Sequence, residues 1–542
     1  MPSIWATAPL MKSAKITRFE LLLFAAFFAF AAWLMWHTFQ YYNSTIYIAG
    51  KAWSDFAAHL PLIRSFSWGQ NWPPEYPLFP NEPIRYHFLF YFLVGNLEKF
   101  GLPLDWALNL PSALGLGGLM MMIYLLGKLI FQSHLTGFLA VMLFLFNSSL
   151  AFLEFFKKHA FKEIFTNATF PTFGPWDGKV ISAFWNLNIY TNQRHLAPAF
   201  FLTLFIVYLI LKNKKLSLGK IFFLSWVIGF LPFFHKVALT IVGLTLSGFF
   251  LLFPKKRLDF FLLAGLSFLA VAPQLYLQLS TINSPITFHP GYLIEPPLTL
   301  VRFFSYWWQN LGLSLFFMPL GFFLAPKTGK KLFWAIIPIF LIGYLLKFSP
   351  EVAANHKFFN FFMIIGNLFS AYALTRLFSK SFPIFLIALI SLTLSGFIDF
   401  FPVKNDVFYQ IDDAPKNPDI LWIKNNTPPD AIFLNSSFLY HPASLAGRKI
   451  FYGWPYFTWG IGYQLDQRAI AIKKIHEGDN REIVCLELIN NKIDYLVLEE
   501  SDKNVWPAQI NSAFFSTNFQ PAYSNLNKLF IIYNVKHNCP RL

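Results

Sequence analysis

The sequence predicts an all-α polytopic membrane protein with about 11–13 transmembrane helices and a C-terminal soluble α/β domain. Of its 542 residues, 56% are hydrophobic and only 13% are charged. A soluble domain carries about 25% charged residues, so this chain lacks the charge to cover a water-exposed surface. Apolar runs long enough to cross a bilayer also recur along most of the chain.

The first predicted span is Leu21–Trp36, which follows Lys12, Lys15 and Arg18. A cleavable signal peptide is the alternative, but bulky residues rather than small ones follow the apolar run. We therefore predict a retained membrane helix. Further apolar runs lie at 86–100, 107–131, 134–153, 195–211, 221–235, 237–254, 260–294, 303–326, 332–346, 358–375 and 381–398.

The basic loops predict the orientation of the chain in the cell membrane. Four loops rich in Lys and Arg (212–215, 255–257, 327–331 and 376–380) alternate with loops that are poor in both. Positive-inside counting places these loops and the N-terminus in the cytoplasm. The outer segments are then 39–85, 166–193, 279–298, 348–356 and everything after about residue 400.

One conflict remains in this count. Three spans between residues 86 and 153 would put 166–193 on the inner side. Either one of the three does not cross, or residues 154–165 complete a crossing.

Two domains are expected from the change in polarity along the chain. Residues 1–400 form the transmembrane domain, with a large outer loop at 39–85, and residues 401–542 form an extracytoplasmic α/β domain. Short β-branched runs alternate there with helical ones. The two cysteines, Cys485 and Cys539, lie in this region, where an oxidising compartment would allow a disulfide. Two buried free thiols are the equal alternative.

Asp55 is the first candidate for chemistry. It lies in the outer loop on a short helix, predicted to be amphipathic and to rest on the membrane surface because Trp53, Phe56, Leu60 and Ile63 recur at helical spacing. A carboxylate there can act as a general base towards a hydroxyl, or ligate a divalent cation through oxygen. The structural alternative is a helix cap formed by Ser54 or Asp55.

Cations at the predicted outer ends of the spans form the second candidate site. Snorkelling of single side chains to the interface is the alternative explanation. Four separate outer ends with Lys or Arg favour a shared basic pocket for a lipid-linked phosphate. These residues are Arg194, His195, His235, Lys236, Arg302, His356 and Lys357.

Two weaker groups complete the candidates. Glu75, Glu82, Arg85, Tyr86 and His87 lie in a Pro-rich polar loop, and we expect at least one of them to reach the outer cavity. In the C-terminal domain, Trp454, Tyr456 and Trp459 suit stacking on sugar rings, or equally docking onto the membrane surface.

Other classes of protein are disfavoured by what the sequence lacks. It contains no P-loop, no GxGxxG after a strand, no HExxH and no GxSxG. No Cys/His cluster predicts a metal site, so no metal ligand is expected. The net charge of +16 is explained by cytoplasmic loops and the basic pocket rather than by binding to nucleic acid.

Several of these segments resemble the GT-C glycosyltransferase superfamily, and in particular its YYY-type branch of bacterial and archaeal membrane proteins. The resemblance covers most of the chain. It is carried by Trp53-Ser-Asp-Phe, Pro73-Pro-Glu, Pro83-Ile-Arg-Tyr-His, Asn192-Gln-Arg-His-Leu-Ala-Pro, Leu231-Pro-Phe-Phe-His-Lys, Trp422-Ile-Lys-Asn-Asn-Thr-Pro-Pro-Asp and Ala446-Gly-Arg-Lys.

The resemblance implies an inverting transfer of a sugar from a polyprenyl-phosphate carrier to a glycan or protein acceptor outside the cytoplasm. Asp55 matches the acid that serves the family as base or metal contact. Many relatives have two adjacent acids there, whereas Ser54 precedes Asp55 here, which leaves a divalent cation as an open cofactor. The predicted substrate-binding residues are His59, Arg85, His87, Arg194, His195, His235, Lys236, Arg302, His356 and Lys357.

Three other functions remain open at this stage. A transporter or flippase of lipid-linked intermediates would need polar residues at mid-depth, and the long charge-free spans argue against one. A non-catalytic scaffold in envelope assembly would tolerate loss of Asp55. An oligosaccharyltransferase differs from the favoured function only in its acceptor.

Overall fold

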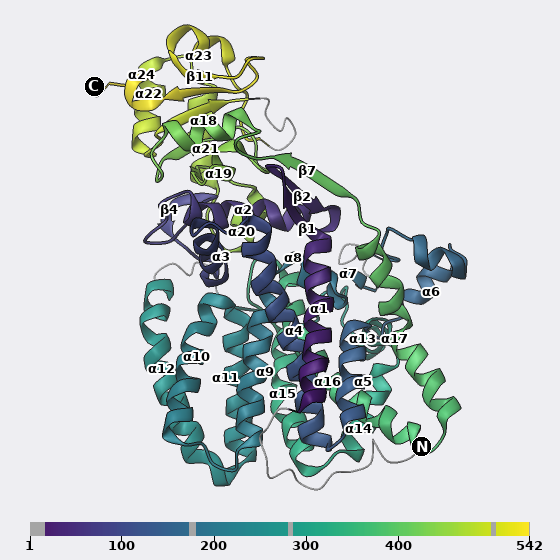
Figure 1. Ribbon diagram of the computed structural model, residues 1–542. Helices are drawn as coiled ribbons and strands as arrows, with labels where there is room; N and C mark the ends of the chain where they lie inside the picture. Colours follow the sequence, from purple (N-terminus) through teal and green to yellow (C-terminus); the bar gives the residue numbers. More distant parts are fainter. Residues whose placement is uncertain (1–16, 173–179, 280–285, 500–505, 541–542) are drawn as a thin grey trace.

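The computed structural model describes residues 17–172, 180–279, 286–499 and 506–540. Figure 1 shows a block of long helices that carries a smaller α/β region at one end. The last described residues lie at the far side of this α/β region, and the first helix, which begins at Arg18, starts at the opposite end of the helical block. We call the end of the block next to the α/β region the outer end.

The helical block has the composition of a multi-pass membrane protein. Within the described ranges, five helices are long and apolar enough to cross a membrane. Two more, α11 and α12, pass the same test together and are joined by a bend of 114°. The five are α1 (Arg18–Thr38), α4 (Leu104–Phe131), α15 (Lys327–Leu345), α16 (His356–Phe378) and α17 (Phe382–Lys404), and the pair is α11 (Lys236–Leu252) and α12 (Arg257–Leu279).

Four shorter apolar helices complete the block. They are α5 (His134–Leu145), α9 (Leu196–Lys212), α10 (Leu218–Phe234) and α14 (Ser314–Leu324). Their neighbours bury them on several sides, so helices that are short for a bilayer are held by protein as well as lipid. The predicted fold class is confirmed.

The structure resolves the conflict in the crossing count. The run at 86–100 was predicted to be a span, but it folds as α3 (Leu89–Lys99), which has only 11 residues. At 1.5 Å per residue such a helix is about half the thickness of the hydrocarbon core. It packs instead against α2 (Trp53–Ser67) at the outer end. Between residues 86 and 165 this leaves α4, which is long enough to cross, and α5, a shorter apolar helix of 12 residues that packs against α4 and α16.

Two other predicted spans are broken. The run at 303–326 was expected to be one crossing, but Gly312 (φ 51°) divides it into α13 (Leu300–Leu311) and α14. The run at 134–153 ends as a helix at Leu145, and α6 (Ala151–Phe156) follows separately. Short outer helices then lead to α9: η2 (Phe161–Thr166), α7 (Ser182–Trp185) and α8 (Asn188–Asn192).

The outer loop is tied to the C-terminal region by a shared sheet. Strands β1 (Phe39–Tyr42) and β2 (Thr45–Ala49) form a hairpin, and β7 (Phe408–Asp412) pairs antiparallel with β2. Thr45 lies opposite Asp412 and Ala49 opposite Phe408. The rest of the loop contains η1 (Gly50–Ala52), α2, β3 (Glu75–Tyr76) and β4 (Phe79–Pro83).

Helix α2 was predicted to lie on the membrane surface with one exposed side, and this was wrong. Every side chain from Phe56 to Ser67 is buried. Helix α3 covers it on one side and α19 (Pro442–Leu445) of the C-terminal region covers it on another. A buried position explains why the helix carries apolar and small residues around most of its circumference.

The C-terminal region is built on a five-stranded sheet in the order β11-β12-β10-β8-β9. Strands β8, β9 and β10 run parallel, and β12 is antiparallel to β10 and β11. The strands are β8 (Ile432–Leu434), β9 (Lys449–Ile450), β10 (Tyr495–Leu498), β11 (Pro521–Ser524) and β12 (Ile531–Asn534), and the helices are α18 (Pro418–Asn426), α20 (Pro455–Gly460), α21 (Asp466–His476), α22 (Arg481–Asn490), α23 (Ser512–Asn518) and α24 (Val535–Asn538).

This region confirms the predicted α/β class, and it settles the state of the two cysteines. Cys485 on α22 and Cys539 after α24 form a disulfide, with their Cα atoms 5.4 Å apart. The proposed domain boundary near residue 400 stays a prediction. Two strands of two residues each, β5 (Thr287–Phe288) and β6 (Leu346–Lys347), form a further small ladder at the outer end.

A buried ion-pair network fixes α2 in place. Arg64 of α2 is 1% exposed, and its guanidinium lies 2.5 Å from the Asp413 carboxylate and 3.3 Å from the Glu98 carboxylate of α3. The guanidinium also stacks on Trp68 at 3.4 Å from the ring centroid. One side chain therefore connects the outer loop, α3 and the segment that enters the C-terminal region.

Removal of the Asp413 carboxylate tests this connection. Asp413→Ala leaves a buried guanidinium short of its shortest partner, so we expect the free energy of unfolding to fall by about 3–5 kcal/mol. The measurement is the thermal unfolding midpoint of the purified protein. The control is Asp412→Ala, which removes the neighbouring carboxylate from a half-exposed pair with Lys416 and should change the midpoint little. Equal shifts for the two variants would contradict the assigned role of Arg64.

Candidate functional site

Asp55 lies in the first turn of α2, where outer-end loops from the whole chain meet. The cap residue of this helix is Ala52, and no side chain caps it. The alternative of a capping role for Ser54 or Asp55 is thus not what the structure shows. Asp55 as a residue is partly exposed, like Trp53 before it, whereas every residue of α2 from Phe56 onwards is buried.

The surroundings of Asp55 shift its ionisation towards neutral pH. Burial raises the pKa of the Asp55 carboxyl to about 6, while the Lys357 ammonium and a side-chain hydrogen bond from Asn192 oppose the shift. The Asp55 charge also acts on the hydroxyls of Tyr86, Tyr440 and Tyr456. A carboxyl with a pKa near 6 is well suited to accept a proton at neutral pH.

Tyr440 ties the C-terminal region to this helix turn. Its hydroxyl donates to the backbone carbonyl of Trp53, and its ring lies 4.1 Å from the Trp53 ring. Tyr440 adopts a left-handed backbone conformation, with φ 57°. Trp53 also contacts Tyr409 of β7, with ring centroids 4.7 Å apart. The helix turn that carries Asp55 is consequently held from two sides by residues that follow the last membrane helix.

Five of the predicted substrate-binding residues form one buried imidazole cluster, which we call the histidine cluster. The ring of His87 lies 4.2 Å from that of His195 and 4.5 Å from that of His235. His195 in turn lies 5.9 Å from His59. The neighbouring His235 acts electrostatically on His356, whose Nδ1 lies 2.7 Å from the Asn360 side-chain oxygen. These residues come from α2, the α3 entry, and the outer ends of α9, α10 and α16.

Hydrogen bonds fix the orientation of the cluster. His87 Nε2 and His195 Nε2 are 2.6 Å apart, and His195 Nδ1 lies 2.7 Å from the Tyr91 hydroxyl. His235 Nδ1 accepts from the backbone N–H of Val237 at 3.2 Å. Burial lowers the pKa of His87 well below its ordinary value, and His195, His235, Lys357 and Lys236 lower it further. The rings are thus neutral hydrogen-bonding groups rather than cations.

The nitrogen atoms of His87, His195 and His235 lie within 4.8 Å of one another, which raises the question of a metal ion. The geometry does not favour one. Because His235 Nδ1 accepts a hydrogen bond, the neutral ring carries its proton on Nε2 and has no lone pair there for a metal. His235 Nε2 is buried without a partner, so it is a donor that awaits an acceptor oxygen.

The structure brings some of the predicted cations to the cluster. Lys357, in the first turn of α16, acts electrostatically on Asp55, His87, His195 and His235. The described structure records no hydrogen bond or ion pair for its ammonium. Lys236, at the start of α11, donates to the backbone carbonyl of Arg85 at 2.7 Å.

Three other predicted residues are engaged elsewhere. Arg194 is buried and donates to Thr191, Thr38, Asn109 and the Met35 carbonyl, which ties α8 to α1 and α4. Arg302 is exposed on α13 and donates to the carbonyls of Glu295 and Pro296.

Arg85 is the third of these residues. It pairs with Glu82 at 2.8 Å and donates to the Gly462 carbonyl, with its guanidinium over Tyr463. Arg85 thus holds the Pro-rich loop to the C-terminal region, and its backbone carbonyl positions Lys236.

Sequence reasoning missed the partners that surround Asp55. Asn192 was seen only as part of the Asn-Gln-Arg-His run, and Tyr440 was read without a role. Only the fold shows that both face Asp55. Tyr86 stood among the weaker candidates, and its position beside Asp55 and His87 fulfils the expectation that this loop reaches the outer site.

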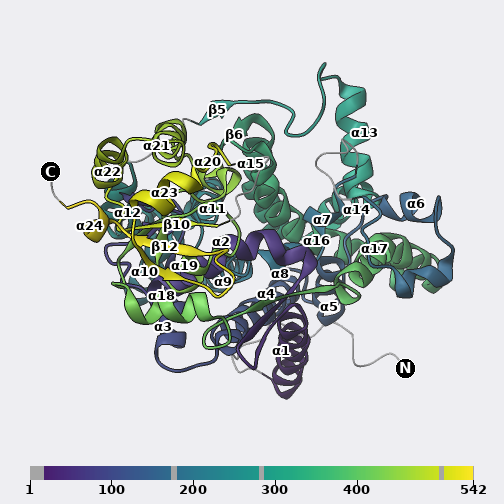
Figure 2. The same ribbon diagram turned by 90° about the horizontal axis from the view of Figure 1, so that it is seen from above.

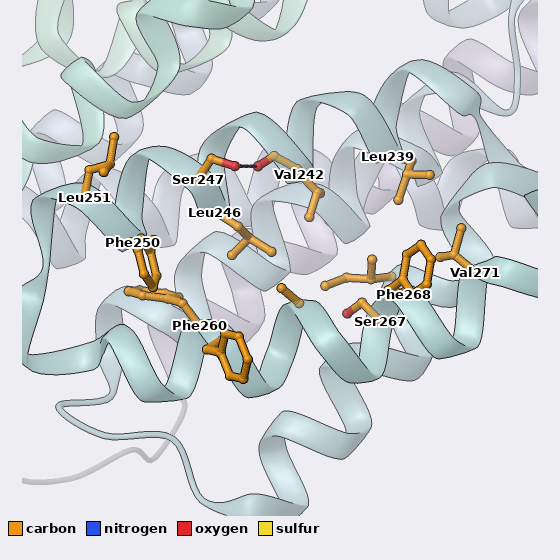
Figure 3. A pocket seen from close by; sticks show the side chains of 14 residues that line it. Leu239, Val242, Leu246, Ser247, Phe250, Leu251, Phe260, Ser267, Phe268 and Val271 are labelled. Carbon is orange, nitrogen blue, oxygen red and sulfur yellow. Dashed lines mark hydrogen bonds between the residues drawn. The ribbon is translucent and has the colours of Figure 1, made fainter.

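A further cavity of about 550 Å³ lies in the membrane block, away from Asp55. Figure 3 shows its lining side chains between two neighbouring helices. Helices α11 and α12 provide most of the lining, with Ile228 of α10. The cavity begins one turn beyond Lys236 and reaches Leu251, and Ser247 and Ser267 are the polar side chains among its residues. We call it the membrane groove.

The comparisons with known proteins agree with this architecture. No protein-family model and no curated protein matches the chain. Among solved structures, ArnT from Cupriavidus metallidurans matches with a TM-score of 0.51 at 11% identity, over 95% of this chain and 97% of that one. The mycobacterial arabinofuranosyltransferase AftD matches with a TM-score of 0.52 at 12% identity, over 98% of this chain but only 40% of its own.

A third structure, the oligosaccharyltransferase AglB from Archaeoglobus fulgidus, matches over 97% of this chain and 76% of that one, at 12% identity and a TM-score of 0.45. The chain therefore shares the membrane fold of ArnT and AftD, which agrees with the fold that the sequence resemblance implied.

The ionisation of Asp55 predicts a pH dependence. If the carboxylate is the working form, activity should be constant above about pH 6 and fall tenfold per unit below it, because protonation removes the base. Asn192→Ala removes a hydrogen bond that favours the carboxylate, so the acid limb should move to higher pH. The measurement is kcat/KM against pH for both proteins. If the acid limb of the pH profile is the same in both proteins, the group that titrates there is not Asp55.

Proposed function

We propose that this protein is an inverting membrane glycosyltransferase that moves a sugar from a polyprenyl-phosphate donor to an acceptor hydroxyl outside the cytoplasm. One observation carries the proposal. The Asp55 carboxyl, which caps no helix, lies at the outer end of the membrane helices within electrostatic reach of the Lys357 ammonium, for which the described residues record no hydrogen bond or ion pair. A base and an anion-binding group are the two parts that such a transfer needs.

The roles follow from the chemistry of the reaction. Asp55 takes the proton of the acceptor hydroxyl, whose oxygen then bonds to the anomeric carbon of the sugar. The bond between that carbon and the phosphate oxygen breaks, and the phosphate leaves with the electron pair. Lys357 and the Nε2–H of His235 stabilise the growing charge on this phosphate. The attack comes from the face opposite the phosphate, so the configuration inverts.

The electrostatics of the pocket favour a phosphate over a cation as its occupant. Lys357 acts on three of the clustered imidazoles and on Asp55, and Lys236 also lowers the pKa of His87. An anion gains from both ammonium groups and from the free donor of His235. A divalent cation would be repelled by the same groups. We therefore propose a reaction in which the chain's own cations assist the leaving group.

We further propose that the Asp55 pocket faces away from the cytoplasm. The four basic loops follow α9, α11, α14 and α16 at the end of the block opposite the C-terminal region. Positive-inside counting assigns that end to the cytoplasm. The disulfide between Cys485 and Cys539 supports an oxidising compartment for the other end.

Asp55→Asn tests the reaction. We expect transfer to fall about 10²- to 10⁴-fold, because the amide cannot accept the acceptor's proton. The measurement is mass spectrometry of envelope glycans and glycoproteins from cells that lack the gene and are complemented with each variant. Asp412→Asn is the control on the same face. Full complementation by Asp55→Asn would support a scaffold or a transporter and would overturn the proposal.

The membrane groove is suited to the lipid part of such a donor. The groove runs along α11 and begins one turn after Lys236. A phosphate bound near Lys236 would therefore be next to the end of the groove that holds the lipid chain. Its lining is apolar, as an isoprenoid chain requires. The groove is wide beside Gly243, where a side chain would meet no atom within 4 Å.

Gly243→Leu tests this position for the chain. A leucine there fits without clash and occupies part of the groove, so KM for a long-chain donor should rise roughly tenfold. A donor analogue with two isoprene units should be affected less. Gly265→Leu on α12 is the matched control, because that site is equally open but does not line the groove. Equal effects of the two substitutions on KM would show that the isoprenoid chain of the donor does not bind in the membrane groove.

A further inference from the structure

The short helix α20 of the C-terminal region presents two bare aromatic rings. Thr458 is fully buried and Phe457 packs against the core that contains α2. On the other side, Tyr456 is 45% exposed and Trp459 is 43% exposed, with ring centroids 6.4 Å apart. The helix is thus anchored on one side, and its free side carries two large apolar surfaces next to each other.

This free side is close to the proposed base. Figure 1 shows α20 at the lower edge of the C-terminal region, next to α2, and Figure 2 shows it above the outer ends of α11 and α15. Partial burial raises the pKa of the Tyr456 hydroxyl, and the charges of Glu351 and Asp55 both raise it further. The pair of rings and the carboxylate of Asp55 therefore face the same space.

The membrane surface is a poor explanation for these rings. Interfacial aromatic residues stand at the perimeter of a helical block, where lipid headgroups reach them. In the view from above, α20 lies over the helices rather than beyond their edge. Its nearest recorded charges are two carboxylates, and Gly460 beside the rings has open space where a side chain would stand.

A sugar ring suits the surroundings of these two aromatic rings better than a peptide does. The C–H faces of a sugar are apolar and pack on aromatic rings, while its hydroxyls donate to carboxylates. Glu351 uses one carboxylate oxygen to cap η4 (Val352–Asn355). Its other oxygen has no recorded partner among the described residues and can accept from a hydroxyl. The two rings can pack on a sugar ring, the Glu351 carboxylate can accept a hydrogen bond from its hydroxyl, and the proposed base is nearby. These are the groups that a carbohydrate acceptor needs.

We propose that Tyr456, Trp459 and Glu351 form an acceptor subsite that binds a sugar ring of a glycan, and that the acceptor is a carbohydrate. The inference rests on the proposed function for the identity of Asp55 as base. The rings hold the penultimate part of the glycan, and the hydroxyl to be glycosylated reaches Asp55. Trp459 and Tyr456 are positioning residues in this scheme.

The test measures binding, which needs no transfer. Purified protein in nanodiscs is mixed with soluble fragments of mannan, glucan, galactan and arabinan, and with a pool of Ser/Thr peptides. Saturation-transfer NMR reports contact. We expect at least one oligosaccharide to bind the wild type, and Trp459→Ala to weaken it about five- to tenfold. Because this readout measures binding and not transfer, failure of the proposed reaction and failure of this subsite are distinguished.

Two further variants test whether a loss of binding by Trp459→Ala is specific or results from misfolding. Trp72→Ala removes a more exposed tryptophan, in the outer loop, and should leave binding unchanged. Gly460→Leu adds a side chain into open space beside the rings and should weaken binding like Trp459→Ala.

Three outcomes would overturn the proposal. One is that no oligosaccharide of the panel binds, and another is that Trp72→Ala and Trp459→Ala have equal effects. The third is that peptides bind in a Trp459-dependent way, which would assign the surface to a protein acceptor.

Discussion

The buried ion pair between Arg64 and Asp413 is the interaction on which the outer half of this protein depends. Burial of a guanidinium is costly unless it is paired, and here two carboxylates and an aromatic ring compensate it. The pair fixes α2 between the membrane block and the C-terminal region. Because Asp55 lies on the same helix, the position of the proposed base is set nine residues away from the residue that secures it.

The same confinement explains the chemistry of the pocket. A helix buried on most sides places its first-turn carboxylate among apolar and neutral groups, which raises the pKa of Asp55 towards neutrality. The neighbouring imidazoles are kept neutral for the same reason and serve as hydrogen-bonding groups. Charge is left to Lys357, so one cation faces one base across the site. An acid with a shifted pKa beside a free cation is an arrangement typical of active sites.

Sequence patterns predicted which residues lie close together more successfully than they predicted the role of each residue. The cations at the outer ends were grouped by topology alone, and the structure does bring Lys236 and Lys357 together with the three histidines of that group. Arg194 and Arg302 belong to the same pattern, yet one ties helices together and the other caps a surface turn. A basic residue at a helix end looks alike in both cases, since hydrogen-bond partners such as Thr38 come from distant segments.

The sequence by itself determined the membrane architecture, because a bilayer imposes the length and the apolarity of each crossing on a local stretch of chain. It also determined the α/β class of the C-terminal region and drew attention to Asp55. Only the tertiary structure decided that α3 does not cross, that α2 is buried rather than superficial, and that Asn192 and Tyr440 meet Asp55. These features depend on packing between segments hundreds of residues apart, and no local pattern records such contacts.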